Sequence, residues 1–230
     1  MKDLQIKRLV PKVVKRPIKK ALLRRQLSRA IKKIADLNGG QIPSRDLLAS
    51  LIEGWSNEGF VANLDYLEEV ARRTIETRGN ILECGSGVTT ILMGVLCAKT
   101  KKQVWSLENS ADWQERIVRV LETNGILHTN VCYSPLIEYG EFCWYDSRQA
   151  NMPKEFSLII CDGPPGSTRG GRFGLLPVMR PCLNSGTTIL LDDAGRPGEI
   201  ELIKRWEQEV KFDTNIIDRS GHIFAVMRLL

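Results

Sequence analysis

A glycine turn between an apolar strand and a helix places the strongest constraint on the fold of this chain. Residues 81–90 read ILECGSGVTT, so an apolar segment is followed by Gly85, Ser86 and Gly87 and then by a helical pattern. Glycine allows close approach of a ligand, and the first N–H groups of the following helix are free. This arrangement is typical of α/β folds that bind nucleotide-like ligands at the carboxyl ends of their strands. The third glycine of G-x-G-x-x-G is replaced by Thr90. The ligand-binding residues predicted here are Glu83, Gly85, Ser86, Gly87, Thr89 and Thr90.

The next predicted strand also ends in an acid. Gln103 to Leu107 form an apolar segment, and Glu108 follows it, 23 positions after Gly85. A carboxylate at about this spacing accepts the hydroxyls of a ribose in dinucleotide-binding folds. A solvated acid at the end of a strand is the alternative. Together with the glycine turn, the pattern predicts a nucleoside site that includes Glu108 and Asn109, a geometry that nicotinamide-dependent dehydrogenases share.

Two later strands end in acids as well. FSLIICDGPPG over 156–166 ends its strand at Asp162, and GTTILLDDAGRPGE over 186–199 ends its strand at Asp192 and Asp193. With LECGSG, SLEN, WYD at 144–146 and RFGLLP at 172–177, the run over about residues 55–230 resembles the class I S-adenosylmethionine (SAM) methyltransferases. The resemblance is to the group that includes small-molecule and sugar O-methyltransferases.

This resemblance implies a Rossmann-like α/β fold. We expect a seven-stranded, mostly parallel sheet with helices on both faces and SAM as the cofactor. In this family the acid before the first glycine, here Glu83, is associated with the amino-acid end of SAM, and Asp162 is assigned to the same site. The expected acceptor is a hydroxyl of a small molecule or a glycan.

The acidic strand ends raise the question of a metal. Catechol-type O-methyltransferases hold Mg²⁺ with an acid after the fourth strand and an Asp-Asn pair after the fifth. Asp162 and Asp192 match this pattern, and Asp193 stands where the asparagine would be. Carboxylate oxygens suit a hard cation, so the resemblance implies a Mg²⁺ site at these three residues. The lysine of the catechol enzymes, three residues beyond the first acid, is replaced by Pro165.

A metal-free alternative stays open. Asp193 would then pair with Arg172 or Arg196, and Asp162 or His222 would be the general base. The catalytic candidates are therefore Asp162, Asp193 and His222.

The segment Ser167–Phe173 is rich in glycine and arginine. Arg169 and Arg172 are expected to bind an anionic or glycosyl acceptor, because guanidinium groups pair well with phosphate and carboxylate. A merely solvated loop is the alternative.

Two aromatic segments are candidates for contacts with a ligand. Trp55, Asn57 and Phe60 are predicted to cover the pocket or to pack between helices. A second segment after the predicted third strand, Thr129–Tyr133, is predicted to touch an adenine ring or to join the core; its aromatic residues are Tyr139, Phe142, Trp144 and Tyr145.

Two rival functions come from other classes of protein. A nicotinamide-dependent oxidoreductase would share the first two turns, but the missing third glycine disfavours it. A catalytically inactive adaptor that binds membrane or nucleic acid would keep the fold, but the intact acids at 83, 108 and 162 disfavour that interpretation.

The positive charge of the chain is concentrated at its beginning. Residues 1–33 contain thirteen lysines or arginines and one acid, Asp3, whereas the formal charge of the whole chain is only +6. From Pro17 onward, apolar residues recur at helical spacing to about Asn38. We therefore divide the chain into a basic amphipathic helical extension, 1–40, and a methyltransferase domain, 41–230.

Three interpretations of this extension remain open. It is an ordinary helix docked on the catalytic domain, an interfacial helix on anionic lipid, or an arm that binds nucleic acid. Residues 1–37 contain no aromatic residue, which makes nucleic acid the less favoured partner. We expect this segment to be dispensable for SAM binding and to contact an anionic membrane surface.

Cysteine usage and hydropathy give an expectation for localisation. The six cysteines form no C-x-x-C pair and are typical of small core residues in a reducing compartment. No apolar run is long enough for a membrane span or a signal peptide. The expected localisation is cytoplasmic, with a peripheral position at the membrane as the alternative.

Overall fold

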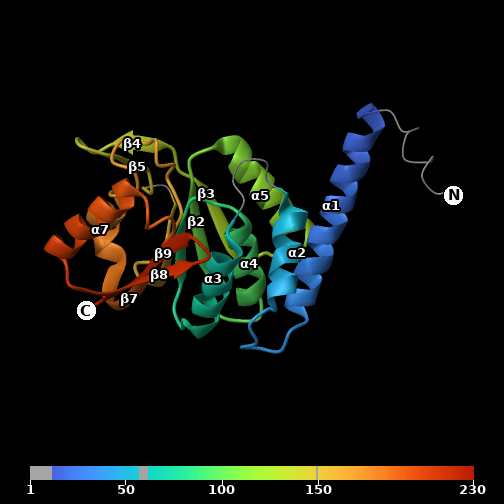
Figure 1. Ribbon diagram of the computed structural model, residues 1–230, viewed down its shortest axis with the longest axis horizontal. Coiled ribbons are helices and arrows are strands. Elements are labelled where there is room, and N and C mark those ends of the chain that lie inside the picture. Colours follow the sequence, from blue (N-terminus) through green and yellow to red (C-terminus); the bar gives the residue numbers. More distant parts are fainter. Residues whose placement is uncertain (1–11, 57–61, 149) are drawn as a thin grey trace, which may run out of the picture.

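The core of the protein is a seven-stranded sheet with the order β3-β2-β1-β6-β7-β9-β8. We analysed a computed structural model, which describes residues 12–56, 62–148 and 150–230. Strands β1 (Ile81–Cys84), β2 (Val104–Glu108), β3 (Thr129–Tyr133), β6 (Phe156–Cys161) and β7 (Leu183–Leu191) are parallel, whereas β9 (His222–Leu229) is antiparallel to β7 and to β8 (Phe212–Arg219). The predicted fold, a mostly parallel seven-stranded sheet with helices on both faces, is confirmed (Figure 1).

Alternate residues of the strands supply two separate cores. Ile81 and Ile160 point to one face, where they pack with residues of helices α1 to α5, while Leu82 and Ile159 point to the other. The helices of the first face are α1 (Lys12–Ala35), α2 (Arg45–Trp55), α3 (Leu64–Glu76), α4 (Val88–Cys97) and α5 (Ala111–Thr123).

The second face is covered by helices α6 (Leu175–Met179) and α7 (Pro197–Glu209) and by aromatic residues. A short 3-10 helix, η2 (Arg180–Cys182), leads from α6 into β7. The aromatic segment after β3 is a small hairpin of β4 (Leu136–Glu138) and β5 (Cys143–Tyr145), where the sequence predicted a loop. Trp144 and Tyr145 are fully buried in this core, which agrees with the packing interpretation of this segment.

Side-chain caps fix the beginnings of α2 and α3. Ser44 accepts a hydrogen bond from the Leu47 N–H, and Asn63 accepts from the N–H groups of Asp65 and Tyr66. These caps orient the two helices against the sheet. The intervening candidates Asn57 and Phe60 lie outside the described residues.

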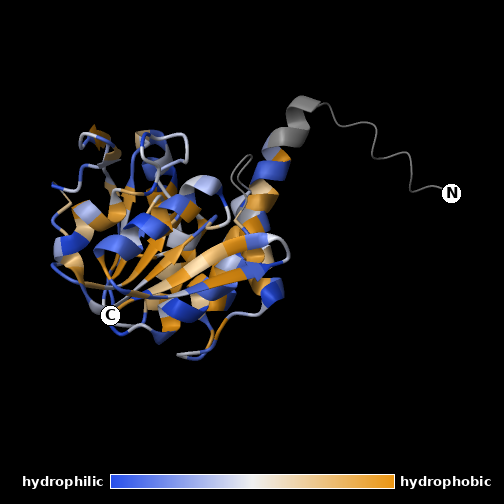
Figure 2. Cartoon of the chain, turned by 60° about the vertical axis from the view of Figure 1, so that its left-hand side comes forward, coloured by the Kyte–Doolittle hydropathy of each residue, from blue (hydrophilic) through white to orange (hydrophobic). Residues whose placement is uncertain are grey.

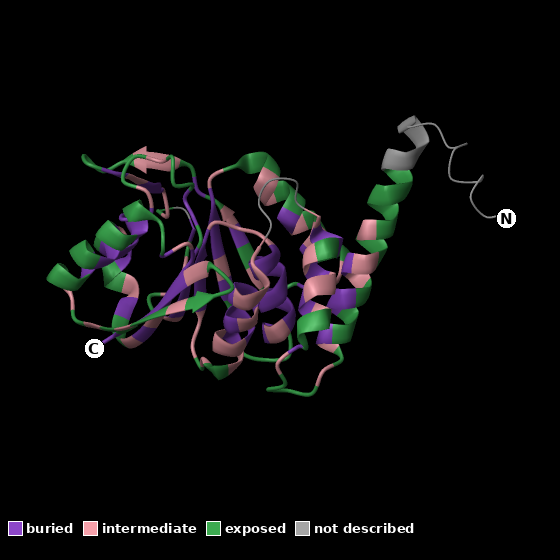
Figure 3. Ribbon diagram, in the orientation of Figure 1, coloured by how far each residue is buried: buried purple, intermediate pink, exposed green. Residues whose placement is uncertain are grey.

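Helix α1 is longer than predicted and is partly integrated into the core. It begins at Lys12, so Pro17 lies inside it rather than at its start. Its second half buries Leu27, Ala30, Ile31 and Ile34 in the first core. The first interpretation, a helix docked on the catalytic domain, therefore holds for this half, although the charge pattern suggested an appendage (Figure 3).

The preceding part of α1 leaves the body of the molecule (Figure 2). Ile18 and Leu22 are more than half exposed there, among exposed lysines and arginines. Among the described residues, no helix is both long and apolar enough to cross a membrane. The division at residue 40 stays a prediction, and it falls between two helices that share one core.

Candidate functional site

The glycine turn after β1 meets a second glycine turn after β6. Gly85 has a φ of +87°, and a Cβ atom built on it would lie 3.0 Å from Cα of Gly163. A Cβ on Gly163 would in turn lie 2.9 Å from Cα of Gly85. Each position therefore requires glycine, and the two backbones form a narrow cradle at the carboxyl edge of the sheet.

Glu83 stabilises this turn by hydrogen bonds with the threonines that follow it. Its carboxylate is fully buried and accepts hydrogen bonds from the hydroxyls of Thr89 and Thr90, both at 2.5 Å. The Thr90 hydroxyl also accepts the Gly87 N–H at 2.8 Å. Burial raises the pKa of Glu83 to about 7. In this structure the side chains of Glu83, Thr89 and Thr90 thus face each other and hold the turn.

Glu108 joins the second strand end to the same turn. It is buried, and its Oε2 accepts hydrogen bonds from the backbone N–H and the hydroxyl of Ser86, at 3.0 and 2.7 Å. Its Oε1 accepts the Ser110 N–H at 2.8 Å, beside half-buried Asn109. A carboxylate has about four lone-pair sites, so at least one remains for a ligand hydroxyl. The residues predicted to bind a nucleoside are therefore brought together.

A tryptophan of α5, Trp113, also contacts the turn. The indole N–H of Trp113 on α5 donates to the Ser86 carbonyl at 2.8 Å. Trp55 packs edge-on against Trp113 with ring centroids 5.5 Å apart, and the Arg116 guanidinium lies over both rings. Trp55 was predicted to cover the pocket or to pack between helices, and its burial against Trp113 agrees with packing.

Tyr145 presents a hydroxyl to the glycine cradle. Its Oη is buried without a hydrogen-bond partner among the described residues, and a Cβ on Gly163 would lie 2.3 Å from it. Burial raises the pKa of this phenol well above its ordinary value, so the hydroxyl is neutral and able to donate. An orphaned buried hydroxyl beside a cradle of glycines fits a polar ligand at this place.

The acids after β6 and β7 surround a buried arginine. Arg172 is only 3% exposed, and its Nη2 donates to the carbonyl of Asp162 at 2.7 Å and to Oδ1 of Asp162 at 3.1 Å. The same nitrogen donates to Oδ2 of Asp193 at 3.2 Å, and Nη1 donates to the carbonyl of Asp192 at 2.5 Å. Arg172 is therefore held at the sheet edge by these contacts, whereas the sequence predicted that it binds an acceptor.

One oxygen of Asp193 and one oxygen of Asp192 have further partners at this edge. Oδ2 of Asp193 accepts from Nη1 of Arg196 at 2.9 Å, as the metal-free interpretation anticipated. Oδ1 of Asp192 accepts the Asp193 N–H at 2.9 Å and lies 2.6 Å from Nε2 of His222. The hydrogen bond with Asp192 raises the pKa of His222.

Asp162 differs from the other two acids because its side chain is 45% exposed. Desolvation raises its pKa above the ordinary range, and the charge of Asp192 adds to this, while Arg172 opposes it. It directly precedes Gly163 of the cradle. An accessible carboxylate thus lies next to the cradle.

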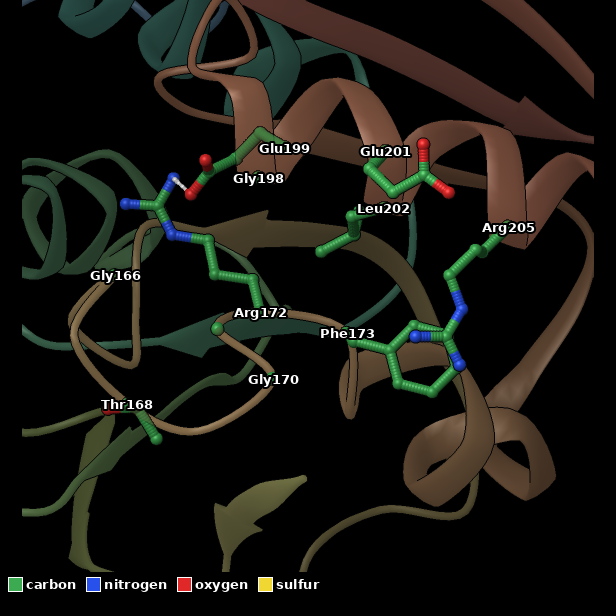
Figure 4. A pocket seen from close by; sticks show the side chains of 11 residues that line it. Gly166, Thr168, Gly170, Arg172, Phe173, Gly198, Glu199, Glu201, Leu202 and Arg205 are labelled. Atoms are coloured by element: carbon green, nitrogen blue, oxygen red, sulfur yellow. Dashed lines mark ion pairs between the residues drawn. The ribbon is translucent and has the colours of Figure 1, made fainter. Parts of the chain in front are cut away.

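A pocket of about 310 Å³ opens between residues 166–173 and the first turns of α7. Figure 4 shows Arg172 pointing to Glu199 on one side, while Arg205 lies against the ring of Phe173 on the other. The guanidinium carbon of Arg205 is 3.8 Å from the centre of that ring. Arg169 is half exposed and pairs with Glu138 at 3.1 Å. Arg172 thus lines this pocket and also contacts the acids after β6 and β7.

Comparisons with solved structures identify the fold. An O-methyltransferase from Bacillus cereus in complex with SAH has a TM-score of 0.58 and 14% identity, covering 97% of this chain and 94% of that one. SAH-bound methyltransferase PaMTH1 from Podospora anserina has a TM-score of 0.53 and 13% identity, covering 96% and 98%. Precorrin-6y C5,15-methyltransferase from Geobacter metallireducens has a TM-score of 0.57 and 8% identity, covering 75% and 91%.

No protein-family model and no curated protein sequence matches this chain. At the identities of these solved structures, the likeness shows the fold, which is the fold that the resemblance predicted. The residues at the glycine cradle and the acidic edge are therefore the features of this chain that bear on its activity.

Proposed function

We propose that this chain, which has the fold of the class I SAM-dependent methyltransferases, methylates a hydroxyl group of a small molecule or a sugar. SAM would supply an electrophilic methyl group bound to a sulfonium. The contribution of the chain is to hold the cofactor, to orient the acceptor and to remove the proton of its hydroxyl.

The contact between Glu108 and Ser86 is the observation that carries this proposal. It joins the carboxylate at the end of β2 to the glycine turn after β1, and both features were expected of a nucleoside site. The orphaned hydroxyl of Tyr145 beside Gly163 supports a ligand in the same cradle. The residues at the cradle thus fit a nucleoside with a polar amino-acid tail, in which Glu108 would hold the ribose.

Asp162 is the preferred general base. It is accessible, it adjoins the cradle, and its raised pKa makes it a better proton acceptor than an ordinary aspartate. His222, oriented by Asp192, is the second candidate. Asp193 is less suited because two guanidinium groups neutralise its carboxylate.

The cofactor assignment predicts binding of SAM and SAH but not of NAD. Glu108→Ala should weaken SAM binding by about 1–3 kcal/mol, the cost of losing a hydrogen-bonded charged partner. Isothermal titration calorimetry measures both affinities. The matched control is Glu115→Ala, since Glu115 lies on the exposed side of α5, 3.9 Å from Arg119.

A second variant separates ribose binding from support of the turn. Ser86→Ala removes the hydroxyl that donates to Glu108 but leaves the carboxylate in place, so its SAM affinity should stay within about twofold of wild type. Binding of NAD with no binding of SAM would contradict the assignment. Glycan intermediates, phenols and RNA, tested for SAM-dependent methyl incorporation, would identify the acceptor, and Asp162→Asn should then lower kcat more than SAM affinity.

We also propose an anionic membrane surface as the partner of α1. Ile18 is 51% exposed and Leu22 is 58% exposed, and the residues around them include exposed Lys19, Lys20 and Arg25. Apolar side chains flanked by lysine and arginine suit the interface of an anionic bilayer. Because this attraction is electrostatic, it must weaken with salt.

A further inference from the structure

The acidic edge formed by Asp162, Asp192 and Asp193 already contains a positive charge, the guanidinium group of Arg172. Oδ1 of Asp162 and Oδ2 of Asp193 converge on one atom, Nη2 of Arg172, at 3.1 and 3.2 Å. A divalent cation bound by these two oxygens would need the place that this guanidinium nitrogen holds.

A neighbouring set of groups, Asp192, Asp193 and His222, offers ligand atoms within 4.8 Å of one another. One oxygen of each aspartate and Nε2 of His222 already have partners, however. Oδ1 of Asp192 lies 2.6 Å from Nε2 of His222, and Oδ2 of Asp193 accepts from Arg172 and from Arg196. A cation here would compete with a histidine contact and with two positive charges.

Arg172 also bonds to the backbone that forms this edge. It donates to the carbonyls of Asp162 and Asp192, which follow β6 and β7, and it lies 3.8 Å from the buried carboxylate of Glu199 on α7. The planar guanidinium group of Arg172 thus bridges two strand ends and one helix, and its N–H groups fix the direction of each contact. A solvated arginine in a glycine-rich loop would not be buried to 3% exposure.

We propose that Arg172 is the internal cation of this edge and takes the place of a divalent metal. The acids then act as an ion-pair network that positions Asp162, and methyl transfer needs no metal. The first part of this inference stands on the geometry alone, and the second part rests on the proposed function.

The test uses Mn²⁺ as the probe of cation binding. Wild-type protein should show no Mn²⁺ binding at this edge by electron paramagnetic resonance, and Mg²⁺ or EDTA should leave its melting temperature unchanged. Arg172→Met removes the charge at similar length, and it should raise Mn²⁺ affinity by about tenfold or more, since the acids lose their nearest positive charge. Arg196→Met is the matched control, because it removes an exposed partner of the same Asp193 and leaves Arg172 in place.

Arg172→Met leaves buried carboxylates without a counter-charge, which can prevent folding. Arg172→Lys is therefore a second variant, because it keeps a positive charge at this position. The lysine variant should bind no more Mn²⁺ than wild type. Two results would overturn the proposal: Mn²⁺ binding by wild type that Asp193→Asn abolishes, or a folded Arg172→Met protein with no gain in affinity. The measurements of Mn²⁺ binding and of melting temperature need no acceptor. A failure of the proposed function would appear separately, as absent SAM binding, and can therefore be distinguished from a failure of this inference.

The activity experiment tests the second part. With an acceptor in hand, turnover of metal-stripped enzyme in excess EDTA should equal turnover in Mg²⁺. Loss of turnover in EDTA with recovery in Mg²⁺ or Mn²⁺ would overturn metal independence and would restore Asp162, Asp192 and Asp193 as the predicted Mg²⁺ ligands.

Discussion

Glu83 is the residue with the clearest conflict between burial and charge. It is fully buried, its hydrogen-bond donors are the neutral hydroxyls of Thr89 and Thr90, and its pKa is raised from 4.5 to about 7. The folded state therefore binds a proton more tightly than the unfolded chain. Because the native state holds more protons between these two values, this residue makes stability fall as pH rises from about 4.5 to about 7.

Glu83→Gln should remove this dependence in the protein without cofactor. Between pH 5 and pH 8, the free energy of unfolding of the wild type should fall by at most about 3 kcal/mol relative to that of the variant, since each pKa unit corresponds to 1.36 kcal/mol. Above pH 8 the difference should not change further. Urea unfolding at several pH values measures the difference. Parallel stability profiles for the two proteins would show that the carboxyl of Glu83 titrates normally.

Helix α1 combines a buried and an exposed leucine, which allows a matched test of its packing. Leu27 is 4% exposed within the first core, whereas Leu22 is 58% exposed on the projecting part of the same helix. Leu27→Ala should lower the free energy of unfolding by about 2–5 kcal/mol through lost contacts and a cavity. Leu22→Ala should change it by less than about 0.5 kcal/mol. Equal effects in denaturant unfolding would mean that α1 does not pack as the structure has it.

The strand-end acids were predictable from the sequence because of how parallel sheets are built. Glu83, Glu108, Asp162 and Asp192 each follow an apolar run, and the carboxyl ends of parallel strands share one edge. The caps Ser44 and Asn63 were predictable for a similar reason, since a cap depends only on neighbouring residues.

A pairing of Asp193 with Arg172 or Arg196 was an alternative that the sequence left open, but the burial of Arg172 was not predictable in this way. Its partners follow β6 and β7 and lie on α7, so they meet only when the tertiary structure forms, and the glycines around it suggested a solvated loop. The burial of Leu27 and Ile31 agrees with one interpretation that the sequence left open, a helix docked on the catalytic domain, although the basic charge of the segment suggested an appendage. The abundant basic residues of α1 dominate its composition, although only its exposed face carries them.

At the scale of the whole molecule, the beginning of the chain is expected to serve two separable roles. Deletion of residues 1–22 removes Ile18 and Leu22 but keeps the buried residues from Leu27 onward, whereas deletion of residues 1–37 removes both sets. We expect the shorter deletion to keep SAM affinity and melting temperature. The sequence predicted that residues 1–37 are dispensable for SAM binding, but the longer deletion should lower both quantities, because it exposes the core beneath α2 and α4.

Co-sedimentation with vesicles tests the lipid role of α1 by comparing the full-length protein with the protein lacking residues 1–22. Full-length protein should bind phosphatidylserine-containing vesicles at low ionic strength and be released at high ionic strength, since each lysine or arginine near the surface contributes about 1 kcal/mol that salt screens. Neutral phosphatidylcholine vesicles are the control. The protein lacking residues 1–22 should not sediment with either kind. Equal sedimentation of this protein and the full-length protein would eliminate the lipid role. Unchanged SAM affinity and stability after deletion of residues 1–37 would instead show that α1 is an appendage, as its charge alone suggested.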